Sequence, residues 1–309
     1  MTEVNIVFLN SLIIIALGYL LKRTNILTEK NGEIVAKIIF NLTLPAVILK
    51  VTSTIVFKIN LILLPLISIS YGFLMVCIGF LIFRKYPRKM KGLLMMSIIG
   101  FNVANFSFPL IEGIWGNAGL QLIALVDAGN AFSIFVVCYT MGYIFSNSDE
   151  PKKIDVKHIF RNLLKSTPLI SYIIALSLNF SGILLPFFLR DLIDIVSRAN
   201  SPLALLLLGI FLNFKFQKNQ WWMIGKAILI RYVFGLTFGL LLYLFLPSAM
   251  FSNLFRIIIF ISLILPVGLA VIPFSVEMEY DKKLITMIAN LSIVISFILM
   301  WILVLLFNG

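Results

Sequence analysis

Charged residues are scarce in this sequence: Asp, Glu, Lys and Arg make up 12% of its 309 residues, whereas 61% of the residues are hydrophobic. Soluble domains are about one quarter charged and about half apolar. This chain therefore has too little polar surface to cover a water-soluble globule. The composition excludes an ordinary soluble enzyme, a disordered chain and, despite a net charge of +12, a nucleic-acid-binding protein.

Residues and motifs that carry catalysis are also rare. The two cysteines, Cys77 and Cys138, lie inside apolar runs, where a free cysteine behaves as a small hydrophobic residue. His158 is the single histidine, and no His-Glu-x-x-His, Gly-x-Ser-x-Gly or Walker-type phosphate loop occurs in the sequence. We therefore expect no enzymatic activity, no cofactor, no metal site and no ATP-driven pumping.

Long apolar runs make up most of the chain. A membrane-spanning helix needs about 20 apolar residues, and charged or turn-rich stretches divide the sequence into ten such runs. The runs lie at 4–21, 34–56, 60–83, 92–113, 119–145, 166–185, 188–213, 222–246, 254–277 and 284–307. We predict an all-α integral membrane protein with ten transmembrane helices.

The basic residues predict the orientation of these helices. Most of the 25 Lys and Arg residues fall in alternate loops, and the opposite loops hold only Lys50, Lys58, Arg190 and Arg256. Cytoplasmic loops of membrane proteins are enriched in Lys and Arg. We therefore predict a plasma-membrane protein with cytoplasmic basic loops, a cytoplasmic linker at 147–165 and both termini outside.

The two halves of the chain match at one gapless offset of 157 residues. The matched pairs are Ile26-Leu27 with Ile183-Leu184, Pro45 with Pro202, and Pro109 with Pro266. Each half holds five predicted helices, so the halves enter the membrane in opposite senses. We predict two inverted repeats, residues 1–146 and 166–309, an arrangement typical of secondary transporters.

Proline lies near the middle of four predicted spans. Proline removes a backbone donor, and interrupted backbone is tolerated in a membrane only where it is buried in protein or lines a cavity. We predict breaks at Pro45, Pro109, Pro202 and Pro266, the last followed by Pro273.

Polar side chains accompany these prolines and form the predicted substrate site. Amide groups donate hydrogen bonds to a carboxylate without adding charge, and a broken helix exposes backbone N–H groups that favour anions. The candidates are Asn102, Asn105 and Ser107 before Pro109, Asn41 before Pro45, and Arg198 and Asn200 before Pro202. The alternative for Pro109 is a kinked, packed helix whose freed carbonyls bond the asparagines.

Ionisable residues inside a span are expensive and indicate function. Asp127 and Asn130 share one helix face and are candidates to bind a coupling proton or sodium ion. Arg198 suits a carboxylate substrate, and the alternative is an ion pair with Asp194 one turn earlier. Arg231 is expected to extend toward the cytoplasmic side.

Several stretches resemble helices of the auxin efflux carrier family. Asn102 to Gly116 resembles its fourth helix, in which an Asn precedes Pro-Leu by seven positions, and Leu265 to Tyr280 resembles its ninth helix, which ends in Glu-Tyr. Asn41 to Pro45, Pro202 to Gly209 and Asp127 to Asn130 resemble the second, seventh and fifth helices. The order and spacing of these stretches extend the resemblance over essentially the whole chain.

The resemblance implies a PIN-like fold, related to that of the bile-acid sodium symporters, in which the fourth and ninth helices cross where each is broken. It further implies a panel of helices 1, 2, 6 and 7 that moves against a scaffold in an elevator-like cycle, with Asn102 at the position that contacts the substrate carboxylate. Bacterial members are linked to malate, malonate and similar acids, and relatives suggest a homodimer. Arg198 replaces an acidic residue of the plant carriers, which argues against auxin itself.

The expected partners are therefore a small carboxylate and membrane lipids, and no nucleic acid. Two alternatives stay open: an uncoupled facilitator or channel for small carboxylates, and a sodium-coupled symporter of the bile-acid transporter type.

Overall fold

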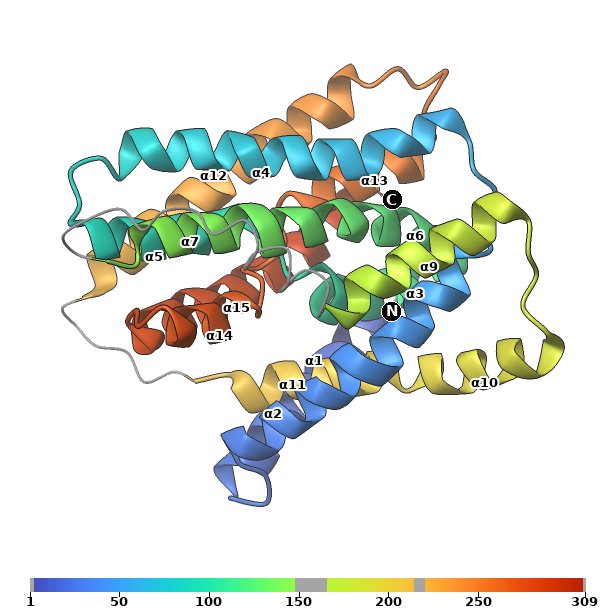
Figure 1. The fold of residues 1–309 in the computed structure, drawn as a ribbon, viewed down its shortest axis with the longest axis horizontal. Helices are drawn as coiled ribbons and strands as arrows, with labels where there is room; N and C mark the ends of the chain where they lie inside the picture. The colour runs from blue at the N-terminus through green and yellow to red at the C-terminus, as the bar shows by residue number, and fades with distance from the viewer. Residues whose placement is uncertain (1–2, 148–165, 214–219, 308–309) are drawn as a thin grey trace. The chain divides into compact units, whose positions relative to one another are not determined.

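The computed structural model describes residues 3–147, 166–213 and 220–307, and regular structure within them is helical (Figure 1). Seven helical stretches among these residues are long and apolar enough to cross a membrane. They are Glu3–Arg23, Glu29–Thr52, Ile59–Ile82, Val103–Phe145, Phe187–Phe211, Trp221–Phe245 and Lys282–Phe307. The prediction of an all-α membrane protein is confirmed, whereas the count of ten crossings stays a prediction.

One of these stretches is too long for a single crossing. Val103–Phe145 has 43 residues, which at ~1.5 Å per residue would span about 65 Å, twice the thickness of a bilayer core of about 30 Å. Within it, α6 (Phe108–Phe132) has a non-helical residue at Gly116, with φ 57° and ψ −147°. Glycine adopts such a positive φ without a steric penalty. The predicted spans 92–113 and 119–145 lie on either side of this kink.

The chain packs into two compact units, and each takes segments from both halves of the sequence. Unit 1 comprises Met1–Leu61, Ala104–Ala128 and Leu164–Leu212. Unit 2 comprises Ile62–Val103, Gly129–Leu163 and Asn213–Gly309. The predicted halves, 1–146 and 166–309, describe a sequence repeat rather than these packing units, and most of the predicted linker at 147–165 lies outside the described residues.

Unit 1 is built on two helix pairs. The first joins α1 (Glu3–Arg23) to α11 (Asn200–Phe211), and the second joins α3 (Leu44–Thr52) to α9 (Thr167–Ser181). α2 (Glu29–Ile38) runs through the π-helical turn η1 (Ile39–Thr43) into α3, and α10 (Phe187–Arg198) packs on α3 (Figure 1). In the first pair the backbones approach closely, because a Cβ on Gly209 would lie 2.0 Å from the carbonyl oxygen of Ile15.

Unit 2 is built around α5 (Arg88–Ile99), whose residues from Gly92 to Ile99 are all buried. α5 packs against α4 (Leu63–Ile82) and α7 (Tyr139–Phe145), which follows the π-helical η4 (Ser133–Cys138) (Figure 1). α12 (Trp221–Phe245), α13 (Asn253–Ser262), α14 (Val271–Glu277) and α15 (Lys282–Phe307) complete the unit. A helix that is apolar on all sides is typical of such a central position.

Three of the four prolines do not lie where the helices are interrupted. Pro45 follows the π-helical turn η1, Pro109 follows a second such turn, η3 (Val103–Ser107), and Pro202 follows the bend at Ala199. At each of these prolines the chain continues as an α-helix, through α3, α6 (Phe108–Phe132) and α11 respectively.

The expected break at Pro109 is therefore wrong. Val103–Phe145 is continuous at that residue, and the interruption before it lies at Gly100–Asn102. Pro266 does lie in an irregular segment, 263–270, between α13 and α14, whereas Pro273 lies within α14.

Candidate functional site

The two irregular segments of unit 2 are hydrogen-bonded to each other. The backbone N–H of Asn102 donates to the carbonyl oxygen of Pro266 at 2.8 Å, and the N–H of Gly268 donates to Gly100 at 3.4 Å. Phe101 and Val267 thereby form a single antiparallel bridge. We call this junction the crossover, defined as Gly100–Asn102 with Pro266–Gly268.

Arg231 of α12 lies against the crossover with its side chain buried. Its Nη2 donates to the carbonyl oxygens of Gly100, Leu265 and Pro266 at 2.9, 2.8 and 2.9 Å. Its Nη1 donates to Ser97 and Ile98 at 3.3 and 3.2 Å, and its Nε donates to Leu265 at 3.1 Å. Arg231 therefore does not extend to the cytoplasmic side as expected, because five carbonyls left free by the helix interruptions bind it instead.

Polar side chains bond further backbone groups at and next to the crossover. The Asn130 amide accepts from the N–H of Phe101 and donates to its carbonyl oxygen, both at 2.9 Å. Ser292 of α15 accepts from the N–H of Val267 at 2.9 Å, and Ser296 donates to Ile264 at 2.7 Å. Such pairing is required where irregular backbone lies at membrane depth.

The side chain of Asn102 is the exception at the crossover. It is only 4% exposed, and its Nδ2 finds no hydrogen-bond partner among the described residues. A buried donor without an acceptor costs about 1–3 kcal/mol. A ligand with acceptor oxygens would remove that cost.

A second buried amide lies in unit 1. Thr43 Oγ1 donates to Asn200 Oδ1 at 3.0 Å, and Asn200 is 1% exposed. The Nδ2 of Asn200 has no partner among the residues described. Asn200 and Asn102 are therefore alike in offering a buried donor, although they belong to different units.

The other predicted amides are placed differently. Asn41 is exposed, and its amide donates to Lys37 and accepts from Thr167 at 2.8 Å. Asn105 and Ser107 are buried in η3, and Asn105 Oδ1 lacks a partner in the described part of the chain. Asn41 is thus held in a local network, whereas Asn105 keeps a free acceptor.

Asp127 and Asn130 lie on one helix but bond to different groups. Asp127 is 6% exposed and accepts a hydrogen bond from the hydroxyl of Tyr172 in α9 at 2.9 Å. Asn130 holds Phe101. The role of this pair in binding a proton or sodium ion stays a prediction, and Asp127 is the member with ionisable chemistry.

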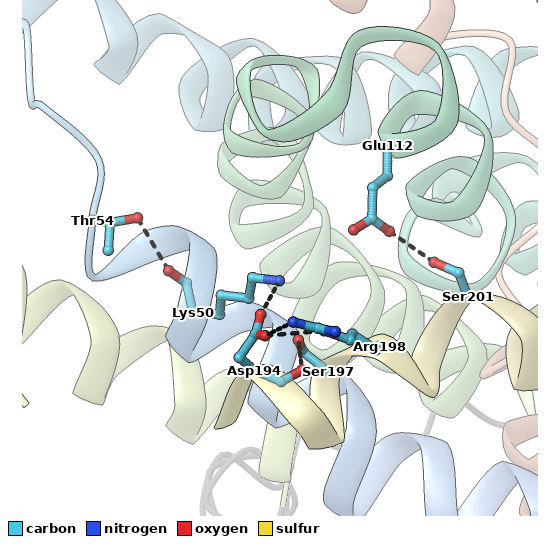
Figure 2. Close-up of polar contacts among 7 residues, drawn as sticks. All are labelled: Lys50, Thr54, Glu112, Asp194, Ser197, Arg198 and Ser201. Atoms are coloured by element: carbon cyan, nitrogen blue, oxygen red, sulfur yellow. Dashed lines mark hydrogen bonds and ion pairs between the residues drawn. The ribbon is translucent and has the colours of Figure 1, made fainter. Parts of the chain in front are cut away.

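A charged cluster in unit 1 surrounds Asp194, as Figure 2 shows. Lys50 Nζ lies 2.6 Å from Asp194 Oδ1, and Arg198 donates to Asp194 Oδ2 through Nε at 3.0 Å and Nη2 at 2.5 Å. Arg198 thus forms the ion pair that its spacing from Asp194 predicts. Its side chain is still 76% exposed, and the cluster carries one more positive than negative charge.

Glu112 of α6 lies in the same unit, and its Oε2 accepts from Ser201 at 2.9 Å (Figure 2). Sequence reasoning did not single out Glu112, Tyr172 or the contact of Lys50 with Asp194. An ionisable residue within an apolar run is the signal that would have found Glu112, whereas nothing in the sequence indicates which helix faces Asp127.

The long apolar helices define a multi-pass membrane protein. The sequence profile of the membrane transport protein family matches residues 5–304. The chain belongs to this family, and its resemblance to the auxin efflux carriers is confirmed. It is a transporter and not an enzyme.

Two archaeal relatives support this assignment. The chain is 27% identical over 212 residues to an uncharacterized transporter of Methanocaldococcus jannaschii, a match covering 65% of this chain and 67% of that protein. It is 24% identical over 222 residues to an uncharacterized transporter of Methanothermobacter thermautotrophicus, a match covering 69% of each.

Proposed function

We propose that this protein is a secondary active transporter that moves small organic anions, such as malate, malonate or other carboxylates, across the plasma membrane. The observation that carries the proposal is that each unit holds a buried amide donor without a partner among the described residues, on Asn200 in unit 1 and on Asn102 in unit 2. A carboxylate supplies acceptor oxygens, and charge-assisted hydrogen bonds to it are about twice as strong as neutral ones.

The cluster around Asp194 supports an anionic substrate. Lys50 and Arg198 together hold one carboxylate, that of Asp194, and Arg198 stays largely exposed. A guanidinium binds carboxylates through two parallel hydrogen bonds. Arg198 is therefore suited to attract a substrate carboxylate at the surface of unit 1, in competition with Asp194.

We further propose ten transmembrane helices in two inverted repeats. In unit 1 the offset of 157 residues relates the two helix pairs, since it carries α1 onto α9 and α3 onto α11. Gly18 then corresponds to Ala175, and Thr52 corresponds to Gly209. The pairs α1–α11 and α9–α3 are therefore equivalent contacts, as a two-fold relation would produce.

An elevator-like cycle is the mechanism that we propose. Unit 1 contains the predicted spans 4–21, 34–56 and 166–185 and all but the last residue of 188–213, together with Ala104–Ala128 from the predicted fourth and fifth spans. The first four spans are the helices that the family resemblance assigns to the moving panel. Their packing into one compact unit supports movement as a single body.

Asp127 is the residue that we propose for ion coupling. Among the described residues of unit 1 its carboxyl is the one that is buried, and Tyr172 donates a hydrogen bond to it. Protonation would make Asp127 a donor and reverse the hydrogen bond with Tyr172, whereas a sodium ion would use the charged carboxylate. Either event changes the charge inside unit 1.

Uptake into proteoliposomes tests these proposals. Labelled malate, malonate, succinate, citrate and an aromatic acid are supplied to the purified protein with no gradient, a pH gradient or a sodium gradient. Saturable uptake of one acid that a single gradient enhances would support the proposal and identify the ion. Lack of uptake of every acid would contradict the carboxylate assignment.

The same assay separates the two alternatives. An uncoupled facilitator or channel would equilibrate the acid without accumulating it under any gradient, and a channel would do so far faster than alternating access allows. A symporter of the bile-acid type would accumulate its substrate only with sodium outside.

A further inference from the structure

Two helices end at the crossover, and carbonyl groups from both ends accept hydrogen bonds from Arg231. Ser97, Ile98 and Gly100 belong to the end of α5, and Leu265 and Pro266 follow the end of α13. The C-terminus of a helix carries about half a negative charge. The two ends therefore place about one negative charge where they meet, and that charge would repel an anion.

Arg231 is the group that faces both ends. Every hydrogen bond that the structure gives it goes to a backbone carbonyl, and no ion pair within the described residues involves it. Its guanidinium also lies 4.4 Å from the ring centre of Phe101. The positive charge of Arg231 is thus balanced by helix ends rather than by a carboxylate.

The position of Arg231 relates this charge to the candidate substrate site. The carbonyl oxygen of Pro266 accepts from Arg231 Nη2 at 2.9 Å and from the backbone N–H of Asn102 at 2.8 Å. Asn102 and Arg231 therefore bind the same carbonyl oxygen, Asn102 through its backbone N–H. The side-chain Nδ2 of Asn102, which has no partner among the described residues, lies on that same residue.

We propose that Arg231 determines the charge selectivity of the transporter. By cancelling the negative ends of α5 and α13 beside Asn102, it allows an anion to approach that amide. This inference rests on the proposed transport of organic anions. Arg231 is a positioning and specificity residue, because its own donors are all used on the backbone.

A purely structural role and a charge role make different predictions for two substitutions. Arg231→Lys keeps the charge but has three donors in place of five, and Arg231→Gln loses the charge and keeps two donors. If Arg231 served only to bond carbonyls, both variants would alter the site in the same way. If its charge matters, only Arg231→Gln changes the preference for anions.

The test measures the electrostatic potential at the crossover directly. Asn102→Cys is introduced with Cys77→Ser, because Cys77 is exposed whereas Cys138 is buried. The modification rates of the new thiol with an anionic and a cationic methanethiosulfonate of similar size are compared. In Arg231→Gln we expect the anionic-to-cationic rate ratio to fall at least about tenfold, the effect of one unit charge at short range in protein.

The controls separate charge from packing. Arg231→Lys is expected to keep the ratio while lowering the thermal unfolding midpoint. Arg256→Gln is the matched control, since Arg256 also donates to a carbonyl, that of Tyr243 at 3.4 Å, and also stacks on an aromatic ring. It should leave the ratio unchanged. Size-exclusion chromatography of each variant verifies folding. If Arg231→Gln does not fold, the rate ratio in Arg231→Lys tests the inference by itself: a retained ratio supports it and a collapsed ratio contradicts it.

An unchanged ratio in Arg231→Gln, or a collapsed ratio in Arg231→Lys, would overturn the inference. Failure of both reagents to reach the thiol at position 102 would also overturn it, because a selectivity residue must act on a path that is open to ions. The measurement needs no transport. A ratio that shifts in a protein that moves no carboxylate would refute the proposed function and leave the role of Arg231 standing.

Discussion

Thr43 donates a buried hydrogen bond to Asn200, and the two residues lie 157 positions apart. This is the separation at which Pro45 matches Pro202 in the sequence. Equivalent residues of two repeats touch each other only near a two-fold axis that relates them. The bond therefore supports an axis of pseudo-symmetry through unit 1, and it fixes one of the two candidate substrate amides.

Thr43→Val is expected to lower the free energy of unfolding by about 1–3 kcal/mol, because the Asn200 carbonyl loses its buried donor. Thermal unfolding in detergent measures the effect. Thr54→Val is the matched control, since Thr54 lies just after α3, is exposed, and donates to the nearby carbonyls of Lys50 and Val51. Equal midpoints for the two variants would contradict a stabilising bond at Thr43.

Asn102→Asp is expected to reduce saturable uptake of the transported acid at least about tenfold, because it replaces a donor by an acceptor that repels a carboxylate. Asn102→Ala should also lose transport, and unchanged uptake in that variant would remove Asn102 from the mechanism. Asn253→Asp is the control. Asn253 accepts from Tyr243 through its Oδ1 at 3.2 Å, and an aspartate keeps that role.

Asp194→Asn should increase the apparent affinity for the transported anion. The substitution removes the carboxylate that occupies Lys50 and Arg198, so the KM is expected to fall about twofold to fivefold at low salt, the range for an exposed ion pair. Salt screens such pairs, so the effect should diminish at high ionic strength. Asp191→Asn, one turn earlier and exposed, should leave the KM unchanged. A raised KM in Asp194→Asn would show that Asp194 positions the two cations rather than competing for them.

Asp127→Asn is expected to abolish accumulation driven by an ion gradient while downhill exchange continues, because the neutral amide can neither release a proton nor offer a charged ligand. Tyr172→Phe removes the hydrogen bond to Asp127 but keeps the carboxyl. It should therefore shift the pH or sodium dependence without abolishing accumulation. Full gradient-driven accumulation in Asp127→Asn would exclude this residue from coupling to either ion.

Gly209→Ala should destabilise unit 1 by about 1–3 kcal/mol, as overpacking of a close contact does. The added Cβ would lie 2.0 Å from the Ile15 carbonyl and would push α1 and α11 apart. Gly225→Ala is the control within another helix, where nothing lies within 4 Å of the added atom. There we expect stabilisation by about 0.5–1 kcal/mol from the higher helix propensity of alanine.

The helices could be predicted from the sequence because membrane thickness fixes the length of an apolar run. The predicted spans 4–21, 222–246 and 284–307 correspond to α1, α12 and α15 within a few residues. The position of an interruption could not be predicted in this way. The helix is continuous through Pro109, and the break lies before it at Gly100–Asn102, so the proline did not mark the position of the break.

The candidate site was predictable to different degrees. The buried amides of Asn102 and Asn200 stand out because polar residues are rare in apolar runs. The ion pair of Arg198 with Asp194, one of two alternatives, follows from helical spacing. The role of Arg231 depends on two helix ends that are far from it in sequence and meet only in the fold, so local reasoning gave the wrong answer.

The bonds of Arg231 also set an order of assembly during synthesis. The carbonyl of Gly100 receives its donor from a residue 131 positions later, and Asn102 pairs with Pro266 later still. A nascent chain inserted from its N-terminus therefore carries the open end of α5 without its permanent partners until α12 and α13 have emerged. Until then, water or the insertion machinery must donate hydrogen bonds to those carbonyls. Completion of the crossover is therefore a late event in the biogenesis of the protein.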